Sequence, residues 1–270
     1  MNFNYEQSIW GRGTATLNVS DPSCFRLKQC LKSFLNLPAN GRILEVGCGA
    51  GQFIGAIKKN MLQADCRGCD ISQQAIEQAK QRNDGVIYEL MNNENSLPYD
   101  SDSFDGVAIF DVLEHAVNPE NLLKEIYRIL RPHGVFYMFV PCEGDNLSFW
   151  HWLDKLGLKN NLTKKFAGHI NYFSRGDIVR LLQKNGFDIS RCRYSEHIVG
   201  QKLGVFSFFM MNRAAKKQNG GQINNEEYFA KFNGSGVSLF KKFVNAWINL
   251  ESCLWQKIPS PNLHITSIKK

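Results

Sequence analysis

The chain has 270 residues, of which 43% are hydrophobic, so it can bury one large α/β core with or without an added cap, and disorder is not expected. No apolar run approaches the length of a membrane span, and the N-terminus lacks the basic start and apolar stretch of a signal peptide. Its eight scattered cysteines are typical of a reduced cytosolic protein, so a cytoplasmic location is expected.

Charge is divided unevenly along the chain, although the formal net charge is only +7. Residues 1–150 carry 13 basic and 18 acidic side chains, whereas residues 151–270 carry 19 basic and 7 acidic ones. Such asymmetry favours an anionic partner for the second half, whether a membrane surface, a phosphorylated substrate or nucleic acid. A solvated basic face is the alternative, because surface charge is energetically cheap.

Helical and extended patterns alternate over the first part of the chain. Residues 1–40 carry a helix-like apolar stripe that ends at Pro38 and Gly41, and they are expected to form an N-terminal cap. Ser72 is a favourable N-cap for a helix. The predicted elements are a strand at 42–47, a helix at about 51–60, a strand at 64–70, a helix after Ser72, and strands at 85–90 and 104–110.

The alternation continues in the second half. Asn118-Pro119 predicts the start of a helix whose apolar period runs until Gly134, and Ser174 with Asp177 predicts a capping box. The other expected elements are a strand at 135–140, a long connection at 142–171, a helix ended by Gly186, a strand at about 187–194, a helix at about 237–258 and a strand at 262–269. Strands that alternate with helices predict βαβ units and a parallel sheet.

A glycine-rich junction follows the first predicted strand. Glycines at 47, 49 and 51 lie between a β-branched run that starts at Ile43 and a helical pattern that includes Phe53. Glycine there permits positive φ angles and close approach of a ligand to the main chain. No Gly-Lys-Ser/Thr is present, which excludes a Walker phosphate loop, and Phe53 and Ile54 stand where the third glycine of a dinucleotide fingerprint would fall.

The junction Glu45-x-Gly47-x-Gly49-x-Gly51 resembles motif I of the class I S-adenosylmethionine-dependent methyltransferases. Later segments match the same family in order and spacing, within the branch of small-molecule and quinone methyltransferases. These segments are Cys69–Ser72, Leu97–Tyr99, Ser103–Val107, Asp111–His115, Leu130–Gly134 and Tyr172–Ser174. The resemblance covers residues 41–195.

This resemblance implies an α/β, Rossmann-like fold with a seven-stranded, mostly parallel sheet and helices on both faces. It also implies a division of the chain into three parts. Residues 1–40 would form the N-terminal cap and residues 41–195 the cofactor-binding core. Residues 196–270 would combine an insertion facing the substrate or a membrane with the last helix and strand of the core.

S-adenosylmethionine is the cofactor that the resemblance implies. The motif I glycines would let its aminoacyl end approach the backbone, Asp70 would bind the ribose hydroxyls, and Ile71 would flank the adenine. Asn93 stands where the family usually has an aspartate that contacts adenine N6, and an amide oxygen can still accept that hydrogen bond. The expected cofactor-binding residues are Glu45, Gly47, Cys48, Gly49, Gly51, Phe53, Asp70, Ile71, Asn93, Phe110 and Asp111.

Two histidines are candidate general bases that would take a proton from the acceptor. His115 directly follows the predicted fourth strand and is the better placed, and His169 belongs to the 142–171 connection. In relatives, Glu-His at this point is often structural, which is the alternative for His115. Asp111, Glu114, His115 and His169 together also resemble the metal sites of some quinone and RNA-end methyltransferases. Those enzymes usually have glutamate in place of Asp111, and catalysis without a metal is the prediction retained.

The predicted activity is methylation of an oxygen atom on a small-molecule or lipid-like acceptor. Methylation of nitrogen or carbon is an alternative, because methyltransferases share the half of the fold that binds the cofactor and differ in their caps. Nucleic acid is disfavoured as the acceptor, because Asp111 to Glu114 lacks the Asp/Asn-Pro-Pro-Tyr/Phe motif of amino-methylating DNA enzymes. Pro141-Cys142 superficially resembles the cysteine nucleophile of cytosine C5 enzymes, but it follows strand five rather than strand four, so Cys142 is interpreted as incidental. The other rival, a non-enzymatic binding protein, is disfavoured by the intact motif I.

Apolar residues gather after residue 141, around Trp150 and Trp152, in the run 203–211, and in the helix expected at about 237–258. The helix by itself is expected to pack its apolar stripe on the sheet as core. The run 203–211, which is followed by Arg213 and Lys216, favours contact with an anionic membrane. A hydrophobic acceptor reached at or near a membrane is therefore expected.

Overall fold

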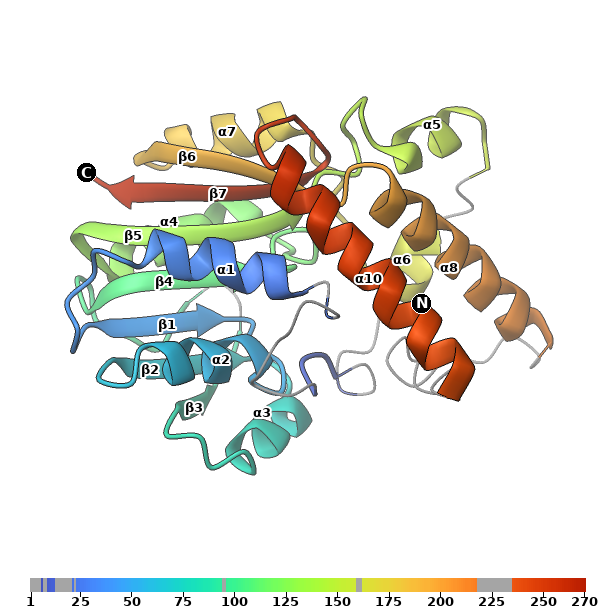
Figure 1. Ribbon diagram of the computed structural model, residues 1–270. Helices are drawn as coiled ribbons and strands as arrows, with labels where there is room; N and C mark the ends of the chain where they lie inside the picture. The colour runs from blue at the N-terminus through green and yellow to red at the C-terminus, as the bar shows by residue number, and fades with distance from the viewer. Residues whose placement is uncertain are drawn as a thin grey trace.

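The computed structural model describes residues 6, 9–12, 21, 23–93, 96–158, 162–217 and 235–270. A central sheet carries helices on both faces (Figure 1). Its seven strands lie in the order β3 (Ile87–Leu90), β2 (Asp65–Asp70), β1 (Arg42–Val46), β4 (Phe104–Phe110), β5 (Leu130–Pro141), β7 (Asn262–Lys269) and β6 (Phe187–Ser195). All are parallel except β7, which runs antiparallel to β5 and β6. Strands β1 to β3 are added toward one edge of the sheet, and from β4 onward the strands lie on the other side of β1. Open α/β sheets bind ligands at such a switch point, here between β1 and β4. The predicted fold class is confirmed.

The elements of the first half follow the predicted order. They are α1 (Ser23–Ser33), β1 (Arg42–Val46), α2 (Gln52–Asn60), β2 (Asp65–Asp70), α3 (Gln73–Lys80), β3 (Ile87–Leu90) and β4 (Phe104–Phe110). The Ser72 side chain caps α3 by accepting a hydrogen bond from the backbone amide of Ala75, as predicted. Of the expected cap at 1–40, residues 1–5, 7–8, 13–20 and 22 lie outside the described residues.

The second half differs from the prediction at the end of one helix, and it contains three helices, at 149–155, 162–166 and 199–217, that the sequence did not predict. It contains α4 (Pro119–Ile129), β5 (Leu130–Pro141), α5 (Phe149–Lys155), α6 (Leu162–Phe166), α7 (Arg175–Lys184), β6 (Phe187–Ser195), α8 (Val199–Lys217), α10 (Ser235–Trp255) and β7 (Asn262–Lys269). α4 begins after the predicted cap Asn118 but ends at Ile129 rather than Gly134. The reason is that Leu130 pairs with Phe104, which draws residues 130–134 into the sheet. The predicted capping box of α7 is present.

Apolar side chains fill both sides of the sheet. One cluster packs α1, α2 and α3 against the sheet and includes Phe34, Ile57 and Tyr137. The other packs α4 and α7 and includes Ile126 and Leu182. Burial of each such side chain contributes about 1.5–3 kcal/mol. Figure 1 shows α1 and α2 on the near face and α4 and α7 behind the sheet, so the carboxyl ends of the strands form an edge between two packed layers.

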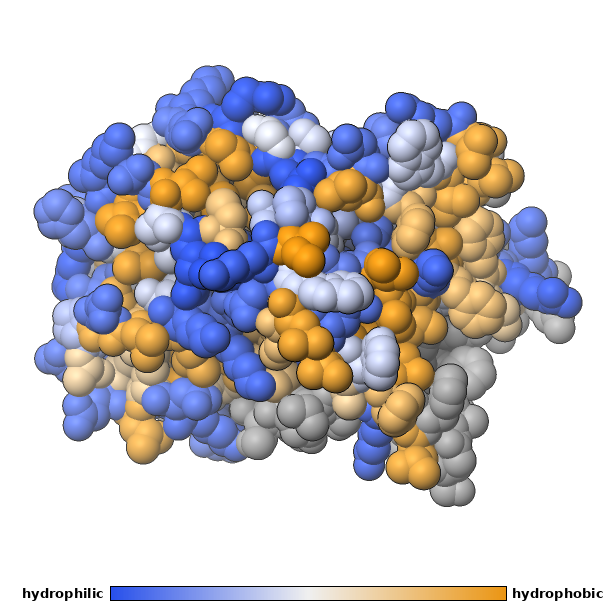
Figure 2. Space-filling view, turned by 45° about the horizontal axis from the view of Figure 1, so that its top comes forward, coloured by the Kyte–Doolittle hydropathy of each residue, from blue (hydrophilic) through white to orange (hydrophobic). Residues whose placement is uncertain are grey.

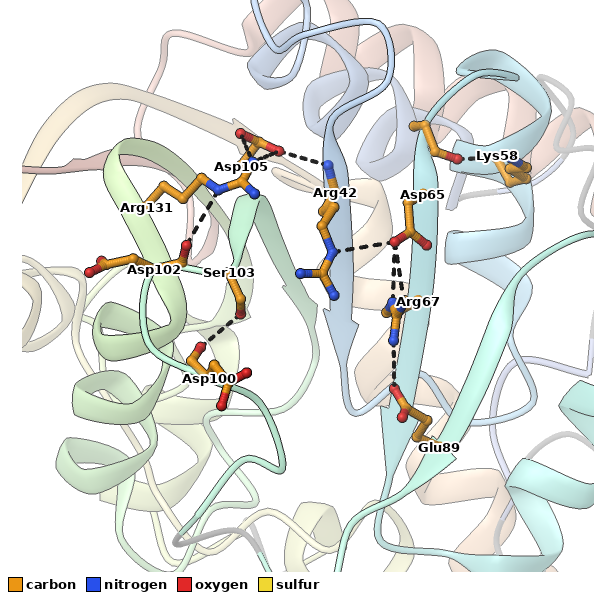
Figure 3. Close-up of polar contacts among 11 residues, drawn as sticks. Arg42, Lys58, Asp65, Arg67, Glu89, Asp100, Asp102, Ser103, Asp105 and Arg131 are labelled. Atoms are coloured by element: carbon orange, nitrogen blue, oxygen red, sulfur yellow. Dashed lines mark hydrogen bonds and ion pairs between the residues drawn. The ribbon is translucent and has the colours of Figure 1, made fainter.

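Ion pairs fasten the sheet at the amino ends of its strands, away from that edge (Figure 3). Arg131 contacts both carboxylate oxygens of Asp105 at 2.7 Å, and Asp105 also accepts a hydrogen bond from the backbone amide of Arg42. Asp65 pairs with Arg42 and with Arg67, each at 3.3 Å. Partly exposed ion pairs contribute about 0–1 kcal/mol each to the free energy of unfolding. These pairs therefore matter more for the register of β1, β2 and β4 than for the stability of the fold.

The prediction that α10 packs its apolar stripe on the sheet is wrong. Leu239, Phe243 and Trp247 are 73%, 67% and 53% exposed. The inward face instead carries Asn249 and Ser252, which are buried and hydrogen-bonded. Among the helices that the structure describes, none has the length and apolarity needed to cross a bilayer.

Candidate functional site

The glycine junction forms a tight turn between β1 and α2. Gly47, Gly49 and Gly51 have φ angles of 72°, 51° and 84°, a region that L side chains rarely adopt. A Cβ atom at position 47 would lie 2.6 Å from the Val112 side chain, and one at position 51 would lie 2.5 Å from the Tyr88 hydroxyl. Both positions therefore require glycine. The resulting tight turn lies at the carboxyl edge of the sheet and brings its backbone amides there.

The carboxylate of Asp70, at the end of β2, is held beside this loop. It accepts hydrogen bonds from the backbone amides of Gly49 at 2.8 Å and Ser72 at 2.9 Å. Burial raises its pKa, although these amides oppose the shift. Because each carboxylate oxygen can accept more than one hydrogen bond, Asp70 retains capacity for the two ribose hydroxyls of a nucleoside. The Ile71 side chain beside it is 42% exposed, and Asn93 lies exposed in the loop after β3.

Two described parts of the expected N-terminal cap contact the same loop and the start of α3. The carbonyl of Trp10 accepts a 2.7 Å hydrogen bond from the Ala50 amide, and a Cβ at Gly49 would lie 2.4 Å from that carbonyl oxygen. Glu6 accepts hydrogen bonds from the amides of Gln73 and Gln74 at the start of α3. The N-terminal backbone therefore occupies the space that Gly49 leaves open.

The remaining motif I residues lie behind the loop. Phe53, in the first turn of α2, stacks on Phe110 at the end of β4 with ring centroids 4.0 Å apart and planes within 5°. Cys48 is buried. Glu45 is 2% exposed and one of its oxygens has no hydrogen-bond partner among the described residues; burial raises its pKa well above the ordinary value.

Asp111 forms an ion pair with an arginine of α1, and its charge also acts on His169. It follows β4 with a positive φ of 52°, and its carboxylate pairs with Arg26 of α1. Arg26 also contacts Glu196, at 3.1 Å, and lies 3.9 Å over the ring of Phe139. Burial raises the pKa of Asp111, and the Arg26 charge opposes that shift. Sequence reasoning missed Arg26, because nothing in the pattern of α1 distinguishes this arginine from a surface one.

Glu114, His115 and His169 meet beyond β4. Glu114 is fully buried, and its Oε1 lies 3.9 Å from His115 Nε2 and 4.0 Å from His169 Nε2. The Glu114 carbonyl accepts hydrogen bonds from the amides of Ile170 and Asn171, which bring the loop after α6 against the loop after β4. Two segments far apart in sequence are thereby joined.

The outer nitrogens of both imidazoles are anchored. His169 Nδ1 lies 2.6 Å from Glu143 Oε1, and His115 Nδ1 lies 3.2 Å from the Gly168 carbonyl oxygen. A carboxylate and a carbonyl can only accept, so each Nδ1 carries a proton, and in the neutral form of each imidazole Nε2 presents a lone pair on the side of Glu114. Glu143 was missed in the sequence, although an acidic residue just beyond a buried strand is a recognisable signal.

Burial dominates the electrostatics of this cluster. Desolvation, reinforced by the charge of Asp111, raises the pKa of Glu114 to about 8, and desolvation lowers the pKa of His115 to about 3. For His169 burial acts downward, but the hydrogen bond and charge of Glu143 outweigh it and raise the pKa. His169 is therefore the stronger base of the two.

The same cluster has the donor atoms of a cation site. One ligand atom from each of Glu114, His115 and His169 lies within 4.8 Å of the others, and neither oxygen of Glu114 has a hydrogen-bond partner among the described residues. Imidazole and carboxylate groups are suitable ligands for divalent transition metals. Asp111, the fourth member of the set considered from the sequence, is not part of this group.

Three buried cysteines near the strands are unreactive. Cys66, Cys69 and Cys142 are buried free thiols, and burial raises the pKa of each. A thiol with a raised pKa is a poor nucleophile and a poor metal ligand. Cys66, Cys69 and Cys142 are therefore part of the packing of the core.

Comparison with known proteins places this site in a family. Residues 25–191 match the family described as a methyltransferase domain. An S-adenosyl-L-methionine-dependent Diels-Alderase of Talaromyces variabilis is 33% identical over 123 residues, which cover 43% of this chain and 41% of the relative. The 27-O-demethylrifamycin SV methyltransferase of Amycolatopsis mediterranei is 30% identical over 138 residues, which cover 48% of each protein. The matched region spans less than half of either relative.

The fold agrees with that of a solved methyltransferase. Phosphoethanolamine N-methyltransferase 2 of Haemonchus contortus, in complex with S-adenosyl-L-methionine, has a TM-score of 0.53 at 19% identity, with 90% of this chain and 52% of that chain covered. The chain carries the fold and the glycine junction of an S-adenosylmethionine-binding methyltransferase domain. It belongs to the methyltransferase domain family, and its cofactor is S-adenosylmethionine.

Proposed function

We propose that the protein transfers the methyl group of S-adenosylmethionine to an oxygen atom of a hydrophobic small-molecule or lipid-like acceptor. The observation that carries this proposal is the cluster of Glu114, His115 and His169 at the carboxyl end of β4, close in sequence to Phe110 and Asp111. Methyl transfer is an in-line displacement, so most of the rate comes from positioning. A base that takes the hydroxyl proton as the new bond forms contributes further.

His169 is the proposed base. Glu143 holds its Nδ1 proton, which leaves the Nε2 lone pair of the neutral imidazole directed toward the cluster, and the same carboxylate raises the pKa of His169. His115 is the proposed neighbour that orients the acceptor through its own Nε2. This order reverses the preference that sequence alone gives, because burial leaves His115 too weakly basic.

The hydrophobic character of the acceptor is inferred from the insertion after β5. α5 and α8 enclose an apolar groove of about 450 Å³ whose lining includes Phe149, Trp152 and Phe209. α6 packs on α8 through Phe166 and Met211, and the His169 loop follows α6 directly. An apolar acceptor bound near this groove would lie on helices that pack against α6, and the loop after α6 carries the proposed base.

Incubation of the pure protein with methyl-labelled cofactor and a cell extract tests the proposal. We expect the label in an organic-solvent-soluble product as a methyl ether or ester, with release of one S-adenosylhomocysteine per methyl group. A His169→Ala variant that binds the cofactor normally should give at most about one hundredth of the label. Label on nitrogen or carbon would assign a different methyl transfer. Formation of a cyclised product without S-adenosylhomocysteine would assign a reaction like that named for the Talaromyces relative.

A metal-assisted form of the same reaction is the second candidate. It is favoured by the three ligand atoms that face one another and by the unpartnered carboxylate of Glu114. A cation there would lower the pKa of an acceptor hydroxyl, and Glu143 would orient His169 as a second-layer partner of the ligand. Metal analysis of protein purified without chelator decides between the two. A stoichiometric cation that is lost in His169→Ala supports the second candidate, and full turnover in chelator supports the first.

A further inference from the structure

α10 is an amphipathic helix whose polar face is buried and whose apolar face is exposed. Its buried face makes polar contacts: the Asn249 side chain donates to the carbonyl of Asp21 at 2.8 Å, and the Glu251 carboxylate accepts from the amide of Ile198 at 2.6 Å. The Ser252 hydroxyl accepts from the amide of Glu196 at 3.0 Å. These contacts attach α10 to the ends of β6 and α8, so its orientation is set by hydrogen bonds.

The outward face of α10 is correspondingly apolar. Its large side chains recur every three or four residues and therefore form one stripe along the helix. The stripe consists of Leu239, Phe243, Trp247, Leu250 and Leu254, each at least 50% exposed. A soluble helix normally buries such a stripe, and contiguous apolar patches of this kind mark an interaction site.

A second apolar surface lies on α5 and α8. Phe206 is 60% exposed and Trp152 is 52% exposed, and both line the open groove of about 450 Å³ between these helices. Figure 2 shows apolar side chains gathered on the side of the molecule where α5, α8 and α10 lie in Figure 1. The α10 stripe and the α5–α8 groove are together called the apolar face.

The charges around the apolar face are mostly positive. Lys202 lines the groove, Arg213 and Lys216 follow on α8, and Lys241 and Lys242 flank the start of the stripe; all five are exposed. Of the acidic residues within α5, α6, α8 and α10, Glu251 is buried against α8, which leaves Asp154 as the exposed acid of these described helices. Apolar side chains bordered by cations are typical of helices that lie in the interface of an anionic bilayer.

We propose that the apolar face docks on an anionic lipid bilayer. The α10 stripe and Trp152 would enter the interface, and the flanking cations would contact lipid phosphates. A second copy of this chain is a poorer occupant, because a twofold interface would bring the same lysines together. The idea that docking delivers the acceptor to the insertion rests on the proposed function, whereas docking itself can be tested without acceptor or cofactor.

Co-sedimentation of the full chain with vesicles tests the proposal. We expect binding to vesicles that contain phosphatidylglycerol, weak binding to pure phosphatidylcholine, and loss of binding as salt is raised. Lys241→Ala and Lys242→Ala should each weaken binding about fivefold, which corresponds to about 1 kcal/mol per cation near the surface. Lys80→Ala, an exposed lysine on α3, is the matched control and should bind as the wild type does.

Apolar contact is tested separately from charge. Leu254→Glu, at a position 70% exposed on the stripe, should reduce binding at least tenfold, whereas Leu62→Glu, at a 75% exposed leucine after α2, should not. Both variants should keep normal circular dichroism and cofactor affinity. Equal binding by these two variants, or no vesicle binding at low salt, overturns the proposal. So does sedimentation of the free protein as a dimer that Leu254→Glu dissociates. Methyl transfer to a water-soluble acceptor, measured without vesicles, reports on the proposed function independently.

Discussion

Asp70 illustrates how one carboxylate organises the cofactor side of the site. It already holds two backbone amides of the loop, and it has capacity for two ribose hydroxyls. Asp70→Ala should therefore weaken S-adenosylmethionine binding by roughly ten- to a hundredfold, because hydrogen bonds to a charged group contribute about 1.5–3 kcal/mol. Titration calorimetry measures this, with Asp188→Ala, an exposed acid on β6, as control. Equal affinities in the two folded variants would contradict the assignment of Asp70.

The pair of Glu143 and His169 predicts a shift in the pH dependence of turnover. Because Glu143 raises the pKa of His169, Glu143→Gln should lower that pKa and move the acid limb of the kcat profile to lower pH. The maximal rate should fall about tenfold, since a weaker base remains in place. The His133→Asn variant, at an exposed residue with positive φ that asparagine tolerates, should leave the profile unchanged. A fall in rate with no change of profile would mean that Glu143 only positions the loop.

At the scale of elements, a buried hydrogen-bond chain connects β5, β7 and β6. The Tyr137 hydroxyl lies 2.7 Å from His264 Nδ1, and His264 Nε2 lies 2.8 Å from the Ser195 hydroxyl. Tyr137 also donates to the carbonyl of Arg26, which attaches α1 to the same edge of the sheet. His264 is 2% exposed, and burial together with the Arg26 charge lowers its pKa well below the ordinary value.

This hydrogen-bond chain predicts a loss of stability in mild acid. The unfolded state takes up a proton on His264 near pH 6.5, whereas the folded state does not, so the free energy of unfolding should fall as pH drops below about 6.5. One such group contributes a slope of up to about 1.4 kcal/mol per pH unit. In His264→Gln the slope between about pH 7 and pH 5 should decrease by up to that amount. Urea denaturation across this range checks it, and an unchanged slope would mean that His264 is protonated in the fold.

At the scale of the whole molecule, the last strand determines whether the sheet is complete. β7 pairs with both β5 and β6 along most of its length, and it buries Leu263 and Ile265 in the core. A chain that ends at residue 195 would keep the whole family match at 25–191 but would leave β6 without its neighbour. We expect this truncated chain to lack a cooperative thermal transition, whereas the full chain has one.

A point substitution in β7 serves as the control for this truncation. The full-length Thr266→Pro variant should be similarly destabilised, because Thr266 lies in a central strand between β5 and β6 and proline has no amide hydrogen to donate to the sheet. Circular dichroism melting compares the truncated chain, this variant and the wild type. A cooperative transition in the chain that ends at residue 195 would show that the core folds without β7, and it would support the division of the chain at that residue.

The sequence by itself determined the fold class, the order of the strands and of the helices that alternate with them, and the caps at Ser72, Asn118 and Ser174, but it did not predict α5, α6 or α8. These features are local: a cap, a period of apolar residues or a glycine turn is decided by neighbours within a few positions. The glycine junction was equally readable, because positive φ angles at 47, 49 and 51 demand a residue without a side chain.

The tertiary structure decided what depends on contacts between distant segments. The end of α4 moved to Ile129 because Leu130 pairs with a strand that lies earlier in the chain. The basicity of His169 and His115 depends on Glu143 and on burial, neither of which the sequence around each histidine reveals. The direction of the α10 stripe was set by hydrogen bonds from its polar face to Asp21 and α8. Hydrophobic period shows that a helix has an apolar face, but the partners of its other face determine whether that apolar face is buried.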